Sequence, residues 1–192
     1  MNRRVLLRGL VILAALIAVT ALLFVTRKQS FKGSVITPPW PAADFTLTNH
    51  NGQPFSMSSQ RGKVVLLYFG FTNCPHECPL TMAHLKLALE QLGDLSKNVQ
   101  VLMVSTDPAR DTHQSLKDFL SSFNPTFLGL TGSPEELQKV WSDYGVTVMD
   151  GGETHSVYLY VIDTAGDIRE TLGLEAEPKD IASDVRLLLR GK

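Results

Sequence analysis

Apolar runs and stretches of helical periodicity alternate along most of this chain. Residues 64–69 (VVLLYF) and 99–105 are short and almost wholly apolar, which is typical of strands buried on both faces of a sheet. Each run precedes apolar residues at helical spacing, over residues 81–92 and about 113–123. This alternation predicts an α/β domain built on an open sheet.

Capping and turn residues define the remaining elements. Ser133 is expected as the N-cap of a helix over 134–144, with Pro134 in its first turn and Glu136 completing a capping box. Turn residues bound the other predicted elements. These are strands at 45–48, 54–57, 126–130, 156–163 and 168–172, and a final helix at 178–189.

The first part of the chain follows a different pattern. Between Arg8 and Arg27 lie 18 uncharged residues, 9–26, rich in Leu, Ile, Val and Ala. As a helix this run spans roughly 27 Å, close to the hydrocarbon thickness of a bilayer. A cleaved signal peptide is the alternative, but its apolar core is usually shorter, and neither a small-x-small cleavage site nor a lipid-acceptor cysteine follows this run. We therefore expect one uncleaved transmembrane anchor.

Charge is divided unevenly along the chain. Residues 1–32 carry six basic and no acidic side chains, whereas the remaining residues carry 12 basic and 19 acidic ones. Because an acidic domain lacks the basic surface that a phosphate backbone requires, nucleic-acid binding is not expected. Basic residues flank both ends of the apolar run, and the short leader favours an N-terminus inside the cell.

These features predict four parts of the chain. They are a cytoplasmic leader at 1–8, the anchor at 9–26, a proline-rich linker at 27–44 and the α/β domain at 45–192. Nothing resembles a long mitochondrial transit peptide, so we expect a bacterial inner membrane with the domain in the periplasm. In that oxidising compartment, two cysteines either pair with each other or hold a soft metal ion.

The two cysteines lie in the most informative stretch, between a predicted strand and a predicted helix. Pro79 limits how early the helix begins, so Cys78 is expected near its N-terminus and Cys74 in the preceding loop. There, free amides and the helix dipole favour a thiolate, which is both a nucleophile and a metal ligand. The four-residue separation allows a disulfide or two thiolates on one ion. A structural disulfide or two inert thiols is the plainer alternative.

Three blocks in this chain resemble the Sco/SenC family of copper chaperones. They are 62–72 (GKVVLLYFGFT) with the C-P-x-x-C-P stretch at 74–79, 106–111 (TDPARD), and His155-Ser156 followed by 158–163 (YLYVID). The resemblance covers about residues 40–190, and the blocks occur in the family's order. It implies a thioredoxin-like fold, a single membrane anchor and copper held by two cysteines and one distant histidine.

The resemblance assigns the copper ligands to Cys74, Cys78 and His155. From the residues alone, His155 is only a histidine after a polar loop, and spacing could not pair it with the cysteines. Two departures stand out. His76 occupies a position where many relatives have an acidic residue. It could add a competing ligand, but we expect a solvated loop residue whose side chain points away from both sulfurs. Thr154 replaces the usual Asp, which is expected to weaken the hydrogen bond that orients the imidazole.

Two functions follow from these residues. In the first, the resemblance implies a metallochaperone that delivers copper to the dinuclear copper centre of a cytochrome c oxidase subunit, with other copper chaperones as further partners. In the second, the protein is a thiol–disulfide oxidoreductase in which Cys74 attacks a disulfide and Cys78 resolves it. Thioredoxin-like reductases usually have a cis-proline opposite the cysteines, at the start of the strand where His155 is expected. No proline lies between residues 145 and 163 in this chain, and a histidine in place of that proline favours metal binding.

Other polar residues of the second block have a simpler interpretation. Asp107, Arg110 and Asp111 resemble functional residues in the family pattern, but a cap between loop and helix and a local ion pair explain them without chemistry. We expect that structural role. A peroxidase is a third function on this fold, but it needs a threonine three residues before its cysteine, and Phe71 stands there instead.

Overall fold

The computed structural model describes residues 13, 16, 30–149 and 154–191. The chain divides into two compact units, residues 1–30 and 31–192. The predicted anchor at 9–26 lies outside the described residues, apart from Leu13 and Leu16, which are helical. Among the residues that are described, no helix is both long and apolar enough to cross a bilayer.

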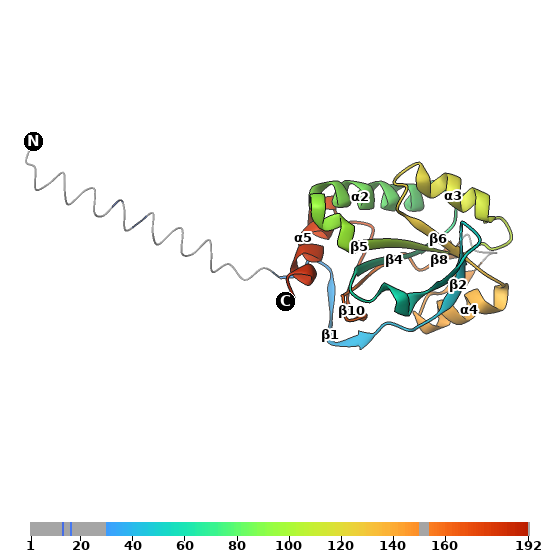
Figure 1. Ribbon diagram of the computed structural model, residues 1–192, viewed down its shortest axis with the longest axis horizontal. Helices are drawn as coiled ribbons and strands as arrows, with labels where there is room; N and C mark the ends of the chain where they lie inside the picture. Colours follow the sequence, from blue (N-terminus) through green and yellow to red (C-terminus); the bar gives the residue numbers. More distant parts are fainter. Residues whose placement is uncertain (1–12, 14–15, 17–29, 150–153, 192) are drawn as a thin grey trace, which may run out of the picture. The chain divides into compact units, whose positions relative to one another are not determined.

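The second unit is built on one eight-stranded mixed sheet (Figure 1). Across the sheet the strands are β1 (Ser34–Pro41), β10 (Asp167–Leu172), β9 (Leu159–Ile162), β4 (Val64–Gly70), β5 (Val99–Ser105), β6 (Leu128–Thr131), β2 (Thr46–Asn49) and β3 (Pro54–Ser56). The central strands β4, β5 and β6 run parallel, and the other pairings in the sheet are antiparallel. Two further short strands, β7 (Val148–Met149) and β8 (Thr154–His155), pair with each other.

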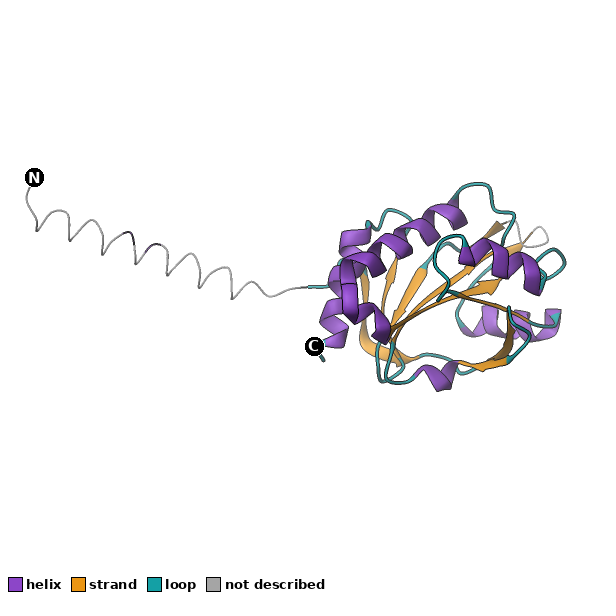
Figure 2. Cartoon of the chain, turned by 45° about the horizontal axis from the view of Figure 1, so that its top comes forward, coloured by secondary structure: helices purple, strands orange, loops and turns teal. Residues whose placement is uncertain are grey.

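Helices cover both faces of the sheet (Figure 2). On one face lie α2 (Glu77–Leu92), α3 (His113–Ser121) and α5 (Pro178–Leu189), and on the other lies α4 (Pro134–Asp143). Two short 3-10 helices, η1 (Met57–Gln60) and η2 (Gly93–Asn98), join elements at the edges. The predicted capping box is confirmed, since Ser133 Oγ accepts the Glu136 N–H and the Glu136 carboxylate accepts the Ser133 N–H.

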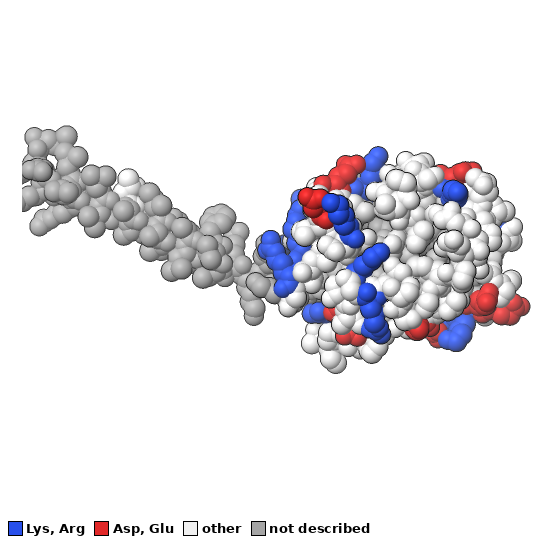
Figure 3. Space-filling view, in the orientation of Figure 1, with Lys and Arg blue, Asp and Glu red and all other residues white. Residues whose placement is uncertain are grey.

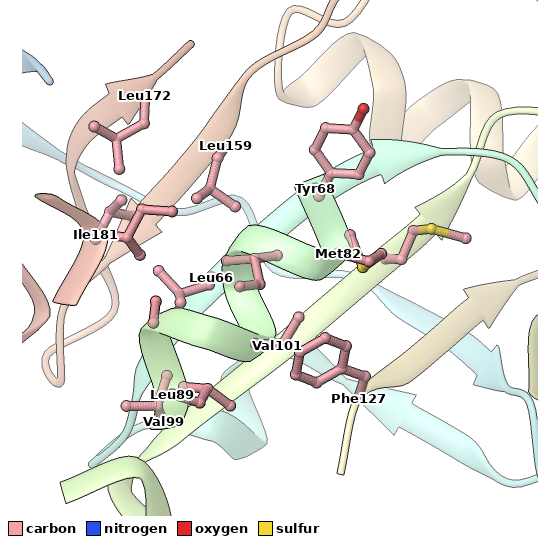
Figure 4. Packing of buried hydrophobic residues seen from close by; sticks show 14 of the residues in the cluster. Leu66, Tyr68, Met82, Leu89, Val99, Val101, Phe127, Leu159, Leu172 and Ile181 are labelled. Carbon is pink, nitrogen blue, oxygen red and sulfur yellow. The ribbon is translucent and has the colours of Figure 1, made fainter. Parts of the chain in front are cut away.

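Strand β4 separates the two apolar cores. All seven of its residues are buried, because Val64, Leu66 and Tyr68 face one core and Val65, Leu67 and Phe69 face the other. Figure 4 shows the first core, where side chains of β4, β5, β9 and β10 meet those of α2 and α5. This burial on both faces explains the unbroken apolar run in the sequence and fixes the carboxyl end of β4, where the cysteine loop begins.

One predicted segment differs from its expected structure. We expected a linker over 27–44, but residues 34–41 form β1, an edge strand that pairs with β10 from Ser34–Thr171 to Pro41–Asp167. The register shifts between Val35 and Trp40, where the prolines lie. Proline cannot donate to a sheet ladder and is therefore confined to edges and bulges. The same prolines that indicated a spacer are compatible with an outer strand.

Charged side chains occur in mixed groups on the face shown in Figure 3. Lys and Arg side chains stand close to Asp and Glu, and wide uncharged areas separate the groups. Exposed ion pairs such as Lys97–Asp94 and Lys139–Asp143 contribute little to stability because water screens them. The fold is therefore held mainly by its two apolar cores.

Candidate metal centre

Both cysteines lie where the loop after β4 enters α2, as the sequence predicted. Helix α2 begins at Glu77, so Cys78 is in its first turn and Cys74 is in the loop. Both are free thiols, with Cys74 8% exposed and Cys78 fully buried. A Cβ atom added at Gly70 would lie 2.8 Å from Cys78 Sγ, so the glycine at the end of β4 leaves room for the sulfur.

The environments of the two sulfurs differ. The backbone N–H of Cys78, in the first turn of α2, donates to Cys74 Sγ at 3.3 Å, so an amide at the helix N-terminus is hydrogen-bonded to the Cys74 sulfur. Burial raises the pKa of the Cys78 thiol to about 12, although a backbone hydrogen bond from Phe71 opposes the shift. At Cys78, desolvation therefore outweighs the helix amides that were expected to favour a thiolate at this site.

Each sulfur contacts a different polar neighbour. The Tyr68 hydroxyl lies 3.7 Å from Cys78 Sγ, within hydrogen-bonding distance for sulfur. The Cys74 thiol donates to Glu77 Oε2 at 3.5 Å. The pair is thus contacted by a buried phenol and by a carboxylate in the first turn of the helix. A carboxylate beside Cys74 can accept its proton when a metal ion replaces it.

His155 lies at the end of β8, close to the cysteine loop. Its Nδ1–H donates to the Ser156 carbonyl oxygen at 3.0 Å, since a carbonyl can only accept. That bond selects the tautomer in which Nε2 keeps its lone pair for a metal ion. The rings of Phe71 and Tyr68 hold the imidazole by edge-to-face contacts, with centroids at 5.9 and 6.3 Å. The orienting hydrogen bond that Thr154 was expected to weaken is therefore made by the Ser156 carbonyl.

A hollow of about 460 Å³ connects these groups. Its walls are formed by Phe71, Asn73, Cys74, Pro75, Glu77, His155 and Val157. Cys74 and His155 therefore open onto one space, and Cys78 lies behind Cys74. Across the described ranges 30–149 and 154–191, no three His, Cys, Asp or Glu side chains are close enough to share a metal ion. The exposed His76 is not among the lining residues.

Asp111 was named from the sequence, but its contact with the cysteine loop was missed. Asp111 is 2% exposed, and its Oδ1 accepts both the Thr72 N–H at 3.0 Å and the Thr72 hydroxyl at 2.6 Å. Its Oδ2 accepts the Ser105 hydroxyl at 2.6 Å. The cap between loop and helix that was expected among Asp107, Arg110 and Asp111 is made instead by Thr112, the N-cap of α3. No spacing rule links Thr72 to Asp111, so the sequence held no signal for this contact.

The other part of that expectation agrees with the structure. The Arg110 side chain forms an ion pair with Asp107, three residues before it, as a local pair requires. Asp107 is 1% exposed, and its N–H donates to Ser105 Oγ at 3.1 Å. The guanidinium of Arg110 also lies 5.9 Å from the centre of the Phe71 ring.

Comparisons with known proteins show the family to which this chain belongs. A model of the SCO1/SenC family matches residues 38–190. The mitochondrial protein SCO2 of Saccharomyces cerevisiae is 37% identical over 139 residues, covering 67% of this chain and 46% of that protein. The chain spans about half the length of the first two curated relatives that it matches, 46% and 55%.

Solved structures give the same fold. The copper-bound structure of Bradyrhizobium japonicum ScoI is 33% identical and superposes with a TM-score of 0.72, covering 78% of this chain and 99% of that one. The structure of BsSco, described as having a disulfide switch and as a member of the Sco family of cytochrome c oxidase assembly proteins, is 26% identical with a TM-score of 0.68. The superposition covers 83% of this chain and 99% of BsSco. The predicted thioredoxin-like α/β fold is confirmed.

Proposed function

We propose, because this chain belongs to the SCO1/SenC family, that it is a copper metallochaperone with Cys74, Cys78 and His155 as ligands. The observation that carries the proposal is the hollow that both Cys74 and His155 line. Cys78 adjoins it, because its backbone N–H donates a hydrogen bond to Cys74 Sγ. Thiolates are soft ligands that select Cu(I), and imidazole suits Cu(II). Two sulfurs and one nitrogen can therefore hold copper in both oxidation states.

The protonation of these residues fits such a site. His155 presents Nε2 with a free lone pair because Nδ1–H is engaged by the Ser156 carbonyl. Cys78 must give up a proton that its burial strongly retains, so copper competes with protons and binding strengthens as the pH rises. The three side chains do not share one ligating position, so loading draws the imidazole and the sulfurs together.

Exposure of the ligands suggests the order of copper transfer. Cys74 and His155 line the hollow, whereas Cys78 is fully buried. A partner's sulfur ligands can therefore replace Cys74 and His155 first and Cys78 last. The partner is the subunit of cytochrome c oxidase that carries the dinuclear copper centre, and other copper chaperones load this chain. The relative BsSco, from a family of oxidase assembly proteins, supports that partner.

A membrane location completes the proposal. Residues 1–8 form a cytoplasmic leader and residues 9–26 a single transmembrane anchor in a bacterial inner membrane. The domain then lies in the periplasm, on the side where a membrane-bound oxidase accepts copper. β1 joins the domain's sheet, so the connection that remains between anchor and domain is short.

A thiol–disulfide reductase is the second candidate. The Cys78 N–H contacts Cys74 Sγ, and both cysteines are free thiols that can donate two electrons and two protons to a target disulfide. Cys74 lines the hollow whereas Cys78 is fully buried, so Cys74 would be the attacking sulfur. The disulfide switch of BsSco supports redox chemistry at such a pair. Reduction of a copper-site disulfide would also prepare a partner to accept copper.

Replacement of His155 separates the two functions. In His155→Ala, two thiolates still bind Cu(I), but Cu(II) loses its nitrogen ligand and with it most of its affinity and its thiolate charge-transfer band. Dithiol exchange with a partner peptide persists in this variant, whereas oxidase assembly in cells fails. His76→Ala is the matched control, since His76 is exposed and outside the hollow. Full oxidase activity in cells carrying His155→Ala would favour the reductase.

A further inference from the structure

We propose that Asp111 is a positioning residue: it holds the loop that carries Cys74 and thereby sets the geometry of the copper site. The inference deepens the proposed function and rests on it. The Asp111 side chain does not line the hollow, and it acts through Thr72. It therefore sets the geometry of the ligands without touching the copper.

The carboxylate joins the ends of two neighbouring strands. Thr72 follows β4, Ser105 ends β5, and Asp111 accepts three hydrogen bonds from them at 2.6 to 3.0 Å. Hydrogen bonds to a charged acceptor are stronger than those between neutral groups. Because Asp111 is almost completely buried, water does not compete for its oxygens. Thr72 is consequently fixed through both its backbone and its side chain.

Phe71, the neighbour of Thr72, touches all three proposed ligands. Its carbonyl accepts the Cys74 N–H at 3.4 Å, and its backbone forms a hydrogen bond with Cys78. Its ring contacts the imidazole of His155. Any movement of the chain at Thr72 therefore shifts Phe71, and with it the relative positions of both sulfurs and the nitrogen.

A merely structural role does not account for this arrangement. β4 and β5 are already paired in parallel along their full length, from Val64–Val99 to Gly70–Ser105, so the sheet does not depend on Asp111. Helix α3 is capped by Thr112, whose Oγ accepts the Ser115 N–H at 3.0 Å. What the carboxylate adds is the fixed position of the loop between β4 and Cys74.

The test uses the full-length reduced chain in detergent and four variants. Thr72→Val removes one hydrogen bond with little change of shape, Thr72→Ser keeps it, and Asp111→Asn removes the charge. Thr112→Val is the control, because it removes a hydrogen bond next to Asp111 without touching the cysteine loop. Each protein is titrated with Cu(II) and followed by the thiolate charge-transfer band and by EPR. The equilibrium of the Cys74–Cys78 disulfide with dithiothreitol is measured without copper.

The four variants are expected to differ in copper binding and in the disulfide equilibrium. Thr72→Val and Asp111→Asn weaken Cu(II) binding by about fivefold or more, the equivalent of one ordinary hydrogen bond. They also shift the charge-transfer band and move the disulfide equilibrium at least about threefold, since both sulfurs need the same loop geometry. Thr72→Ser restores the wild-type values. Thr112→Val lowers thermal stability and leaves the band, the EPR spectrum and the disulfide equilibrium unchanged.

Two results would overturn the assignment of Asp111. One is wild-type copper affinity and spectra in both Thr72→Val and Asp111→Asn, and the other is an equal change in Thr112→Val. If the wild-type chain itself binds no copper, the proposed function fails. The positioning role is then decided by the disulfide equilibrium alone, where unchanged values in Thr72→Val and Asp111→Asn would refute it.

Discussion

Replacing Glu170 by glutamine should change how the stability of the domain depends on pH. Glu170 on β10 and Asp184 on α5 are both fully buried. Glu170 Oε2 accepts the Gly33 N–H at 2.9 Å, and Asp184 Oδ2 accepts the Lys32 N–H at 2.8 Å. Among the described residues, Glu170 Oε1 and Asp184 Oδ1 have no hydrogen-bond partner outside this pair. A proton shared between the two carboxyl groups therefore satisfies both oxygens.

Burial and the nearby charge of Asp184 raise the pKa of Glu170 from 4.5 to about 8. The unfolded chain keeps the ordinary value, so between these two values it binds fewer protons than the folded chain. The stability that Glu170 contributes is therefore complete below about pH 4.5 and is lost as the pH rises through about 8. The slope is at most about 1.4 kcal/mol per pH unit, which sets a ceiling of roughly 4 kcal/mol between about pH 5 and pH 8.

The glutamine variant keeps both hydrogen bonds and cannot ionise. Its Oε1 can accept the Gly33 N–H, and its amide can donate to Asp184. We therefore expect Glu170→Gln to be similar to the wild type near pH 5 and more stable by about 2–4 kcal/mol near pH 8. Denaturant unfolding of the full chain in detergent, followed by circular dichroism, measures this difference. Glu175→Gln, at an exposed acid in the following turn, is the control. Parallel pH profiles for wild type and Glu170→Gln would show that the pKa of Glu170 is not raised in the folded chain.

Three further predictions concern the site and the anchor. Gly70→Ala should destabilise the domain by about 1–3 kcal/mol in a thermal melt, because the new methyl group meets Cys78 Sγ; an unchanged melting temperature would contradict that packing. Oxidation of Cys74 and Cys78 to a disulfide should abolish copper binding, measured by equilibrium dialysis, and retained binding would rule out a thiolate site. The full-length chain should sediment with membranes and its domain should be cut by protease added from the periplasmic side, whereas a soluble form beginning near residue 27 would exclude the anchor.

The main elements of the fold could be predicted because local patterns encode them. The unbroken apolar run at 64–69 indicated a strand with two buried faces, and the capping box at Ser133 and Glu136 marked the start of α4. β1 escaped prediction because its prolines are equally compatible with a spacer and with an edge strand. The short pair β7–β8 was missed because two-residue strands carry too few positions for a pattern.

Predicting the site was harder because its contacts join distant parts of the chain. Cys74 and Cys78 could be recognised from their spacing after a strand, but His155 was assigned only through the family resemblance. The bond between Thr72 and Asp111 depends on the pairing of β4 with β5, which no local pattern shows. The protonation of Cys78 depends on burial by residues outside its own segment. Contacts between distant segments and the burial of a side chain can be known only from the folded structure.

X-ray absorption at the copper edge identifies the ligands of the bound copper. The full-length reduced chain is loaded with one equivalent of copper, and its spectrum is compared with those of Cys78→Ser and His155→Ala. We expect two sulfur ligands and one nitrogen ligand in the wild type, loss of one sulfur in Cys78→Ser, and loss of the nitrogen in His155→Ala. A wild-type spectrum with only nitrogen and oxygen ligands, or one that neither substitution changes, would contradict copper binding by Cys74, Cys78 and His155.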